Sequence, residues 1–225
     1  MVSDKKLTIS CAGFIPWFDL RKYHKPSFFQ RSWNRLWNYK NIDHNNPIGK
    51  SAYFFLEGLI SLKEMRPDVY KNLSVQWWGS ISPHYNQILR EMKLDEVVEI
   101  SGFVPKNISL KRLKKSDVML LTLATGVNGN PPFSLPGKLF DYLRLGKPVI
   151  GVMEESSCSR VLENSGLGVV CSPYSPNSIA ESISHLYDNK DVLSTLYCPN
   201  MQYIENNFSY ETQSKKLVKI ISKYL

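Results

Sequence analysis

The sequence predicts an α/β protein with a doubly wound, mostly parallel, Rossmann-like sheet. Short apolar runs recur along the chain, and several end in glycine, as residues 7–13 and 73–79 do. Amphipathic stretches of helical length separate these runs, for example residues 51–62. Because strands joined by helices pair in parallel, we expect the carboxyl ends of the strands to share one edge, where open α/β sheets bind ligands.

The elements follow in order from apolar runs bounded by glycine and proline. The expected strands are residues 7–13, 73–79, 97–102, 117–123, 149–152 and 169–171. The expected helices are residues 51–62, 84–92, 110–115, 136–145, 156–164, 177–187 and 209–224. Asp117 precedes its strand, at the edge away from the ligand, so we interpret it as a capping or turn residue rather than a catalytic acid.

Length and composition are those of a globular protein. The 225 residues are enough for one large domain or two small ones, and we expect one domain over residues 1–225. No apolar run reaches the roughly 18–20 residues of a membrane span, and the first ten residues lack the apolar core of a signal peptide. The four cysteines have no metal-type spacing, so we expect reduced thiols in a cytoplasmic chain, with Cys11 and Cys171 buried.

The net charge of +8 is compatible with nucleic acid, anionic lipid or a phosphorylated substrate, and charge alone does not choose among them. We expect no bound metal. There is no Asp-x-Asp triplet, and no two histidines stand at metal-ligand spacing; they are His24, His44, His84 and His185.

The most informative stretch is residues 131–151, PPFSLPGKLFDYLRLGKPVIG. Its prolines forbid a continuous helix before Gly137. We expect Ser134 or Leu135 near the helix cap, Pro136 at the first helical position, and Gly146 at the end. The apolar side of this helix comprises Leu139, Phe140, Leu143 and Leu145.

Two side chains of this helix suggest chemistry. The free N–H groups of its first turn lie beside Lys138, and a helix N-terminus with a lysine suits a phosphate. Asp141, one turn further on, can accept hydrogen bonds from a ribose diol. Without any further observation, the same residues would also fit an ordinary helix–turn–strand unit of a doubly wound domain.

Residues 138–143 (KLFDYL) and 146–150 (GKPVI) resemble a signature of the GT-B glycosyltransferases, in the retaining group 1 family that builds bacterial polysaccharides. The resemblance implies a nucleotide-sugar-binding half-domain with a UDP- or GDP-sugar as donor. Asp141 would hold the ribose hydroxyls, and Lys138 would lie near the diphosphate and sugar. The backbone of Pro136, Gly137 and Leu139 would lie there as well.

The resemblance extends to three further places. Gly13 ends the first strand, as in the family. Lys50 opens the next helix, where a family lysine binds donor phosphate. The backbone of Phe103 and Val104 follows a third strand, where the family contacts the base. Gly49-Lys50-Ser51 also resembles a P-loop, but we reject that interpretation because His44 stands where the upstream glycine is needed.

Three positions depart from the family pattern. Asp141 replaces the usual glutamate, Phe133 replaces an upstream glutamate that touches the donor sugar, and Phe14 replaces an arginine after the first strand. The arginines that could substitute for it are Arg21, Arg31 and Arg35.

Residues 15–46 form an expected insertion rich in aromatic and basic residues. The aromatic residues are Trp17, Phe18, Tyr23, Phe28, Phe29, Trp33, Trp37 and Tyr39, and residues 27–40 have helical spacing. One interpretation is peripheral contact of residues 17–40 with the inner face of a membrane holding a lipid-linked acceptor. Another is a segment packed on the domain or on a partner domain. A platform for single-stranded nucleic acid is the third, and we expect no nucleic-acid partner.

Our first hypothesis is the donor-binding half of a glycosyltransferase in polysaccharide biosynthesis, transferring sugar to a glycan or a lipid-linked acceptor. The resemblance places the acceptor site, and the catalytic histidine of the family, in another domain or a second chain, so catalytic residues stay unknown. The alternative is a non-catalytic module that binds a nucleotide or a partner, which Phe14 and Phe133 favour. A sugar-nucleotide epimerase shares the fold but also needs two domains.

Overall fold

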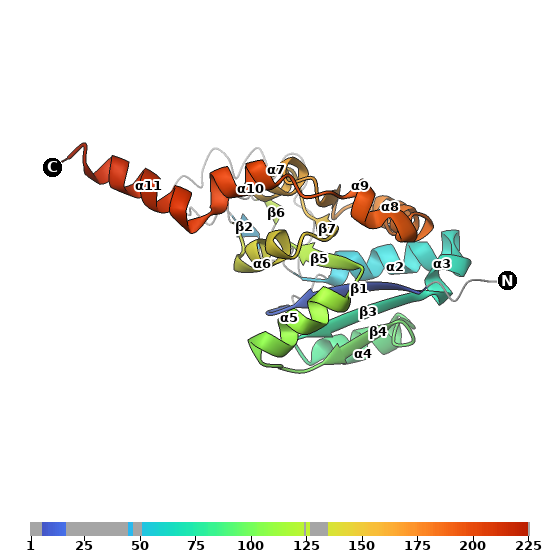
Figure 1. Ribbon diagram of the computed structural model, residues 1–225. Helices are drawn as coiled ribbons and strands as arrows, with labels where there is room; N and C mark the ends of the chain where they lie inside the picture. The colour runs from blue at the N-terminus through green and yellow to red at the C-terminus, as the bar shows by residue number, and fades with distance from the viewer. Residues whose placement is uncertain (1–5, 17–44, 47–50, 124, 127–134, 225) are drawn as a thin grey trace, which may run out of the picture.

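The structure is a computed structural model that describes residues 6–16, 45–46, 51–123, 125–126 and 135–224. Figure 1 shows a central sheet with helices on both sides. The strands of this sheet are β1 (Leu7–Ala12), β3 (Leu73–Trp78), β4 (Val98–Ser101), β5 (Val118–Thr122), β7 (Val149–Val152) and β8 (Gly168–Cys171). The predicted α/β, doubly wound, parallel sheet is therefore confirmed.

The strand order is β4-β3-β1-β5-β7-β8, and every neighbouring pair is parallel. Counted along the chain, these strands follow the order 3-2-1-4-5-6 of dinucleotide-binding folds. The order reverses between β1 and β5, so the carboxyl ends of these two strands flank the crevice where such sheets bind ligands. A small antiparallel pair, β2 (Asn45–Asn46) and β6 (Thr125–Gly126), lies outside this sheet.

Along the chain, helices connect the successive strands of this sheet. They are α2 (Tyr53–Met65), α3 (Pro67–Lys71), α4 (His84–Glu91), α5 (Lys106–Lys115), α6 (Gly137–Leu145), α7 (Ser157–Asn164), α8 (Pro176–Asp188), α9 (Leu193–Leu196), α10 (Met201–Phe208) and α11 (Tyr210–Ile221), with a 3-10 turn η3 (Lys190–Val192). Helix α5 begins four residues before the predicted start at 110, because Pro105 caps it and its carbonyl accepts from the Ser109 N–H at 2.9 Å. The short helices α3 and α9, and helix α10, were not predicted.

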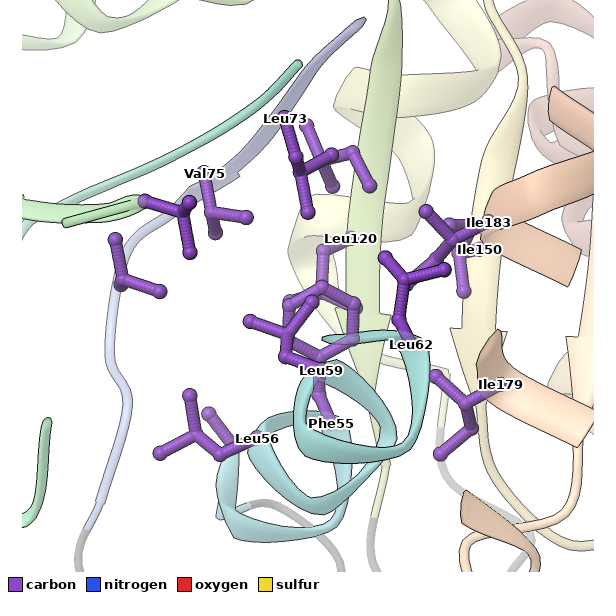
Figure 2. Packing of buried hydrophobic residues seen from close by; sticks show 14 of the residues in the cluster. Phe55, Leu56, Leu59, Leu62, Leu73, Val75, Leu120, Ile150, Ile179 and Ile183 are labelled. Atoms are coloured by element: carbon purple, nitrogen blue, oxygen red, sulfur yellow. The ribbon is translucent and has the colours of Figure 1, made fainter. Parts of the chain in front are cut away.

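One face of the sheet is covered by α2, α4 and α8. Figure 2 shows Phe55, Leu59 and Leu62 of α2 against Leu120 of the sheet, with side chains of α8 alongside. Gly58 lets α2 and α8 approach closely, since a Cβ there would come within 2.4 Å of Ile179 Cγ2. Packing on this face therefore fixes the position of α2, the helix that follows β1 and the expected insertion at residues 15–46.

The opposite face is covered by α5, α6 and α7. Buried apolar side chains on these helices pack against that face of the sheet; they include Leu113, Leu139, Tyr142, Leu143, Cys158 and Leu162. On α6, the predicted apolar side is right for three of its four residues, including Leu145, which is partly buried against this cluster. Leu139 and Leu143 are buried, whereas Phe140 is 39% exposed and meets Phe208 of α10 edge-on at 5.6 Å between ring centroids.

Asp117 has the structural position that its place before β5 predicts. The Thr8 N–H donates to Asp117 Oδ2 at 2.8 Å, and the Asp117 N–H donates to the Thr8 carbonyl at 3.1 Å. Lys190 Nζ lies 3.3 Å from the same carboxylate. These contacts join the starts of β1 and β5 at the edge opposite the switch-point crevice, which leaves Asp117 a structural role.

Candidate nucleotide-binding site

Three consecutive loops at the carboxyl edge of the sheet are joined by backbone hydrogen bonds. The Gly13 N–H donates to the Trp78 carbonyl at 2.9 Å, and the Gly79 N–H donates to the Gly102 carbonyl at 3.1 Å. Gly13 and Gly79 have positive φ angles of 104° and 125°. A Cβ on Gly79 would lie 2.2 Å from the Gly13 carbonyl oxygen, so only glycine allows these loops to touch.

The N-terminus of α6 lies at the same edge, because α6 follows β5 across the switch point. Its position differs by one residue from the prediction: Pro136 is the N-cap with extended dihedrals, and Gly137 is the first helical residue. Proline can precede the helix in this way because it has no N–H to satisfy. Ser134 lies outside the described residues, and Leu135 precedes the cap.

Only some of the backbone N–H groups predicted to bind a ligand at this helix terminus are free to do so. The Leu139 N–H already donates to the Pro136 carbonyl at 2.9 Å, and the expected position of the Leu139 backbone near a diphosphate and sugar stays a prediction. Gly137 and Lys138 are the first two helical residues, whose N–H groups have no acceptor within the helix. The described donors at this terminus are therefore the Gly137 and Lys138 amides.

The Lys138 side chain reaches from α6 to the end of β1. Its Nζ lies 3.8 Å from Cys11 Sγ, and the contact is partly buried. Cys11 itself is 1% exposed. The structure thus brings the Lys138 ammonium to the carboxyl end of β1, next to the loop that contains Gly13.

Tyr142 fixes the height of α6 above the sheet. Its hydroxyl accepts a hydrogen bond from the Ala12 N–H at 3.4 Å and donates one to the Leu120 carbonyl at 3.3 Å. The side chain is fully buried. Burial raises the pKa of the Tyr142 hydroxyl well above its usual value, so the group stays protonated and keeps its donor role.

Asp141 is half-buried and points toward α5. Its Oδ1 lies 3.9 Å from Lys106 Nζ, in an ion pair whose lysine is 78% exposed. An exposed pair at this distance contributes little to stability. The carboxylate therefore remains open to exchange this partner for the hydroxyls of a ligand.

The segment after β4 has one exposed residue and one that is partly buried. Phe103 is 83% exposed, while Val104 packs against the core on the α5–α6 face. Phe14, directly after Gly13, is 65% exposed. The two exposed rings follow β1 and β4, so both stand at the carboxyl edge of the sheet.

The structure therefore brings several predicted residues to one edge: Gly13, Phe103, Val104, Pro136, Gly137, Lys138, Leu139 and Asp141. Lys50, Phe133 and the basic residues 21, 31 and 35 lie outside the described residues, as does the predicted helix at 27–40. Their predicted roles stay predictions.

Lys106 and Tyr142 were not singled out from the sequence. A usable signal existed for Lys106, because it opens α5 directly after the strand-end segment 102–105, and first-turn residues there face the ligand edge. Tyr142 gave no such signal, because a tyrosine beside Leu143 on the apolar side of a helix is expected to be an ordinary core residue. Its role becomes visible only in the tertiary structure, where its hydroxyl meets the Ala12 N–H.

An open cavity of about 240 Å³ lies elsewhere, between β3, β4 and α5. It is lined by Gln76, Glu99, Ser101 and Arg112. Arg112 Nη1 donates to Ser101 Oγ at 3.0 Å, and its guanidinium lies over the Trp78 ring. None of these residues belongs to α6 or to the β1 loop, so the cavity is separate from the candidate site.

Two further findings concern metals and membranes. Within the described ranges, no group of three or more His, Cys, Asp or Glu side chains is placed to hold a metal ion. In the same part of the chain, no helix has the length and apolar character needed to cross a bilayer. Cys11, Cys158 and Cys171 are free and buried, and Cys198 is free and exposed.

No protein-family model matches the chain. Two curated proteins do match in sequence. WbjE of Pseudomonas aeruginosa, named a glycosyltransferase, is 27% identical over 114 residues, which are 50% of this chain and 27% of WbjE. WcaL of Escherichia coli K12, named for glycosyl transfer in colanic acid biosynthesis, is 21% identical over 174 residues, which are 76% of this chain and 42% of WcaL. The chain thus spans less than half the length of these relatives.

Solved structures share the fold at low sequence identity. TarM of S. aureus, solved with UDP, superposes with a TM-score of 0.62 at 11% identity over 96% of this chain and 35% of TarM. HepE of Anabaena, solved with UDP-glucose, gives 0.57 at 16% identity over 92% of this chain and 56% of HepE. The C-terminal domain of the group 1 glycosyltransferase LpcC of Francisella tularensis gives 0.53 at 12% identity over 92% of this chain and 87% of that domain. The sequence matches are therefore to proteins named as glycosyltransferases, and the solved structures show that the chain shares its fold with such enzymes.

Proposed function

We propose that this chain is the donor-binding half of a glycosyltransferase, and that it binds a UDP- or GDP-sugar at the switch point of its sheet. The observation that carries this proposal is the meeting of α6 with the end of β1. The Lys138 ammonium reaches the end of β1 beside the Gly13 loop, and the two free amides lie at the same end of α6. Asp141, one turn further along α6, lies beside Lys106 of α5.

The charges at this edge match the parts of a nucleotide diphosphate. Lys138 and the Gly137 and Lys138 amides offer positive charge and donors to a diphosphate. Asp141, one turn further along α6, offers an acceptor to ribose hydroxyls. The segment after β4, with exposed Phe103 and partly buried Val104, would contact the base. No bound metal is needed in this arrangement, because the lysine and amides supply the positive charge.

In transfer, the bond between the anomeric carbon and the diphosphate oxygen breaks, and the diphosphate leaves with the bonding electron pair. An acceptor hydroxyl bonds to that carbon, and its proton passes to the departing diphosphate. The chain would assist by stabilising the charge that develops on the departing diphosphate. The acceptor, a glycan or a lipid-linked sugar, would be held by another domain or chain. We propose that residues 17–40 contact the membrane that holds a lipid-linked acceptor, and that the protein acts in the cytoplasm.

A second candidate is a module that binds a nucleotide or a partner without turnover. Phe14 favours it, because an exposed ring stands where the glycosyltransferases have an arginine. Adding a separate acceptor-binding polypeptide distinguishes the two candidates. Sugar transfer in the mixture supports the transferase, whereas nucleotide binding without transfer supports the module.

Calorimetric titration with UDP and GDP tests the donor site. We expect the wild-type chain to bind one of them, and Asp141→Ala to weaken that binding. Loss of a charge-assisted hydrogen bond costs on the order of 1.5–3 kcal/mol, or roughly ten- to hundred-fold in affinity.

The matched control is Glu181→Ala, which removes an exposed carboxylate from α8 on the other face of the sheet. It should leave nucleotide affinity unchanged. Absence of binding to both nucleotides at millimolar concentration would contradict the donor-site assignment for this chain.

A further inference from the structure

Tyr85, in the first turn of α4, lies where two distant parts of the chain meet. Pro16 follows Gly13 in the loop after β1, and Ser51 and Ala52 directly precede α2. The Tyr85 hydroxyl donates to the Pro16 carbonyl at 2.9 Å and accepts from the Ala52 N–H at 2.9 Å. It also lies 2.8 Å from Ser51 Oγ. One side chain therefore joins the Gly13 loop to the start of α2.

The three contacts fix the direction of each hydrogen bond. A tyrosine hydroxyl has one proton, and the Pro16 carbonyl can only accept, so that proton goes to Pro16. Ser51 Oγ must then donate its own proton to Tyr85, and it accepts from the Tyr53 N–H at 3.2 Å. The Tyr85 hydroxyl thus uses its donor and two acceptor positions on groups from both chain segments.

The hydroxyl lies in a buried environment with little room to move. Tyr85 is fully buried, and Ser51 is 1% exposed. The Tyr85 ring packs edge-on against Trp77 of β3, at 5.6 Å between ring centroids. Burial raises the pKa of the Tyr85 hydroxyl to about 12, so the group stays protonated and keeps its donor role at neutral pH. Because a buried polar group that loses its partner is costly, these contacts stabilise one another.

Backbone contacts with the loop after β3 hold the Gly13 loop as far as Ile15. The Ile15 N–H donates to the Ser80 carbonyl at 3.0 Å, and the Ser82 N–H donates to the Ile15 carbonyl at 3.3 Å. Pro16 has no N–H to donate, and its carbonyl accepts from Tyr85. Tyr85 therefore continues the attachment of the loop where these backbone contacts end.

The loop that Tyr85 holds borders the phosphate side of the proposed donor site. The Lys138 ammonium lies at the end of β1, 3.8 Å from Cys11 Sγ. Cys11 is the register partner of Trp77, the residue that supports the Tyr85 ring. Asp141, which would hold the ribose, lies instead on the side of α6 that faces α5. A shift of the loop should therefore disturb a bound diphosphate more than a bound nucleoside.

We propose that Tyr85 is a positioning residue of the donor site, whose hydroxyl holds the Gly13 loop and the start of α2 in the arrangement that receives a diphosphate. Tyr85 does not touch the ligand in this proposal, and it acts through Pro16, Ser51 and Ala52. The inference rests on the proposed function, because it concerns how the donor site keeps its shape. Groups that are already in place bind a ligand more tightly, since less ordering is needed on binding.

Calorimetric titration of Tyr85→Phe with UDP and GDP, and with uridine and guanosine, tests this role. Affinity for the diphosphate that the wild type binds should fall about five-fold, as for the loss of one neutral hydrogen bond, while affinity for its nucleoside stays within about two-fold. The matched control is Tyr70→Phe, which removes a buried hydroxyl that donates to the Lys93 carbonyl. It should change neither affinity.

Ser51→Ala tests the α2 side of the network with a smaller change to the core. It removes the hydroxyl that links Tyr85 to the Tyr53 N–H and leaves the Pro16 contact in place. Diphosphate affinity should fall by about two- to three-fold. Combined with Tyr85→Phe, Ser51→Ala should add less than its separate effect, because both variants break the same network. Losses that multiply in full would show that Tyr85 does not act through Ser51.

Amide hydrogen exchange follows the same network without any nucleotide. The Ala52 N–H, which donates to the Tyr85 hydroxyl, should exchange at least about five-fold faster in Tyr85→Phe than in the wild type. In Tyr70→Phe it should exchange at the wild-type rate. Unchanged exchange in Tyr85→Phe would overturn the proposal, because the hydroxyl would then not hold the start of α2.

The titrations separate this proposal from the proposed function. If the wild type binds UDP or GDP and Tyr85→Phe binds it equally well, the positioning role alone is overturned. Equal losses for the diphosphate and the nucleoside also overturn it, because they indicate a general loosening of the fold. A wild type that binds neither nucleotide at millimolar concentration overturns the donor site and the positioning role together.

Discussion

The Ala12 N–H and the Tyr142 hydroxyl meet across 3.4 Å, and this contact joins the last residue of β1 to the middle of α6. The same hydroxyl donates to Leu120 of β5. One side chain therefore links both strands of the switch point to the helix that carries Lys138 and Asp141.

We expect Tyr142→Phe to lower both stability and nucleotide affinity. Removing the hydroxyl deletes two hydrogen bonds, which should reduce the free energy of unfolding by about 1–2 kcal/mol. If the hydroxyl also positions α6, affinity for UDP or GDP should fall several-fold. Urea unfolding and calorimetric titration measure the two effects.

Tyr70→Phe is the control for Tyr142→Phe. Tyr70 is also buried, and its hydroxyl donates to the Lys93 carbonyl at 3.3 Å, away from α6. It should lower stability without changing nucleotide affinity. Equal affinity in Tyr142→Phe and the wild type would limit Tyr142 to a purely structural role.

Lys138→Ala should weaken binding of nucleoside diphosphates more than binding of nucleosides. The ammonium at the end of β1 is proposed to contact phosphate, and a charge-assisted hydrogen bond contributes about 1.5–3 kcal/mol. Affinity for UDP or GDP should therefore fall about ten-fold or more, while affinity for uridine or guanosine changes little. Lys114→Ala, on the exposed side of α5, should change neither. A parallel loss for nucleoside and diphosphate would place Lys138 away from the phosphates.

Gly79→Ala should be more destabilising than Gly13→Ala. Both residues have positive φ angles, but an added Cβ at Gly79 meets the Gly13 carbonyl at 2.2 Å, while one at Gly13 has no atom within 4 Å. We expect a loss of about 1–2 kcal/mol at Gly13 from the backbone conformation alone, and at least about 3 kcal/mol at Gly79. Chemical denaturation measures both. Similar losses would show that the loops separate easily.

The stability of the chain should fall in alkaline solution, partly because of Cys158. Burial raises the pKa of this thiol from about 9 to about 12. Since the folded pKa is the higher one, its contribution is fully present below pH 9 and is lost as the pH rises toward 12. Between pH 8 and pH 11, under reducing conditions, the free energy of unfolding of Cys158→Ala should fall by about 2 kcal/mol less than that of the wild type.

Cys198→Ala removes an exposed thiol and serves as the control for Cys158→Ala. It should show the same difference between pH 8 and pH 11 as the wild type. A Cys158→Ala variant with the pH dependence of the wild type would show that the folded protein opens around α7 before the thiol ionises.

Much of the fold could be predicted from the sequence because its signals are local. Apolar runs such as that at Val118–Thr122 form fully buried strands, and Gly146 adopts the left-handed conformation that ends α6. The small errors, at the start of α5 and at Pro136, concern helix ends, where proline fits more than one capping position. Helix α10 was missed because its side chains are only partly buried, which weakens the periodic pattern.

The sequence by itself determined the parallel α/β class and the helix that carries Lys138 and Asp141, because periodicity, glycine and proline act over a few residues. Only the tertiary structure decided which groups meet. The Gly79–Gly13 contact, the Lys138–Cys11 contact, the Asp141–Lys106 pair and the Tyr142–Ala12 hydrogen bond all join residues from different elements. Such contacts depend on strand order and on the packing height of α6, which no local pattern encodes.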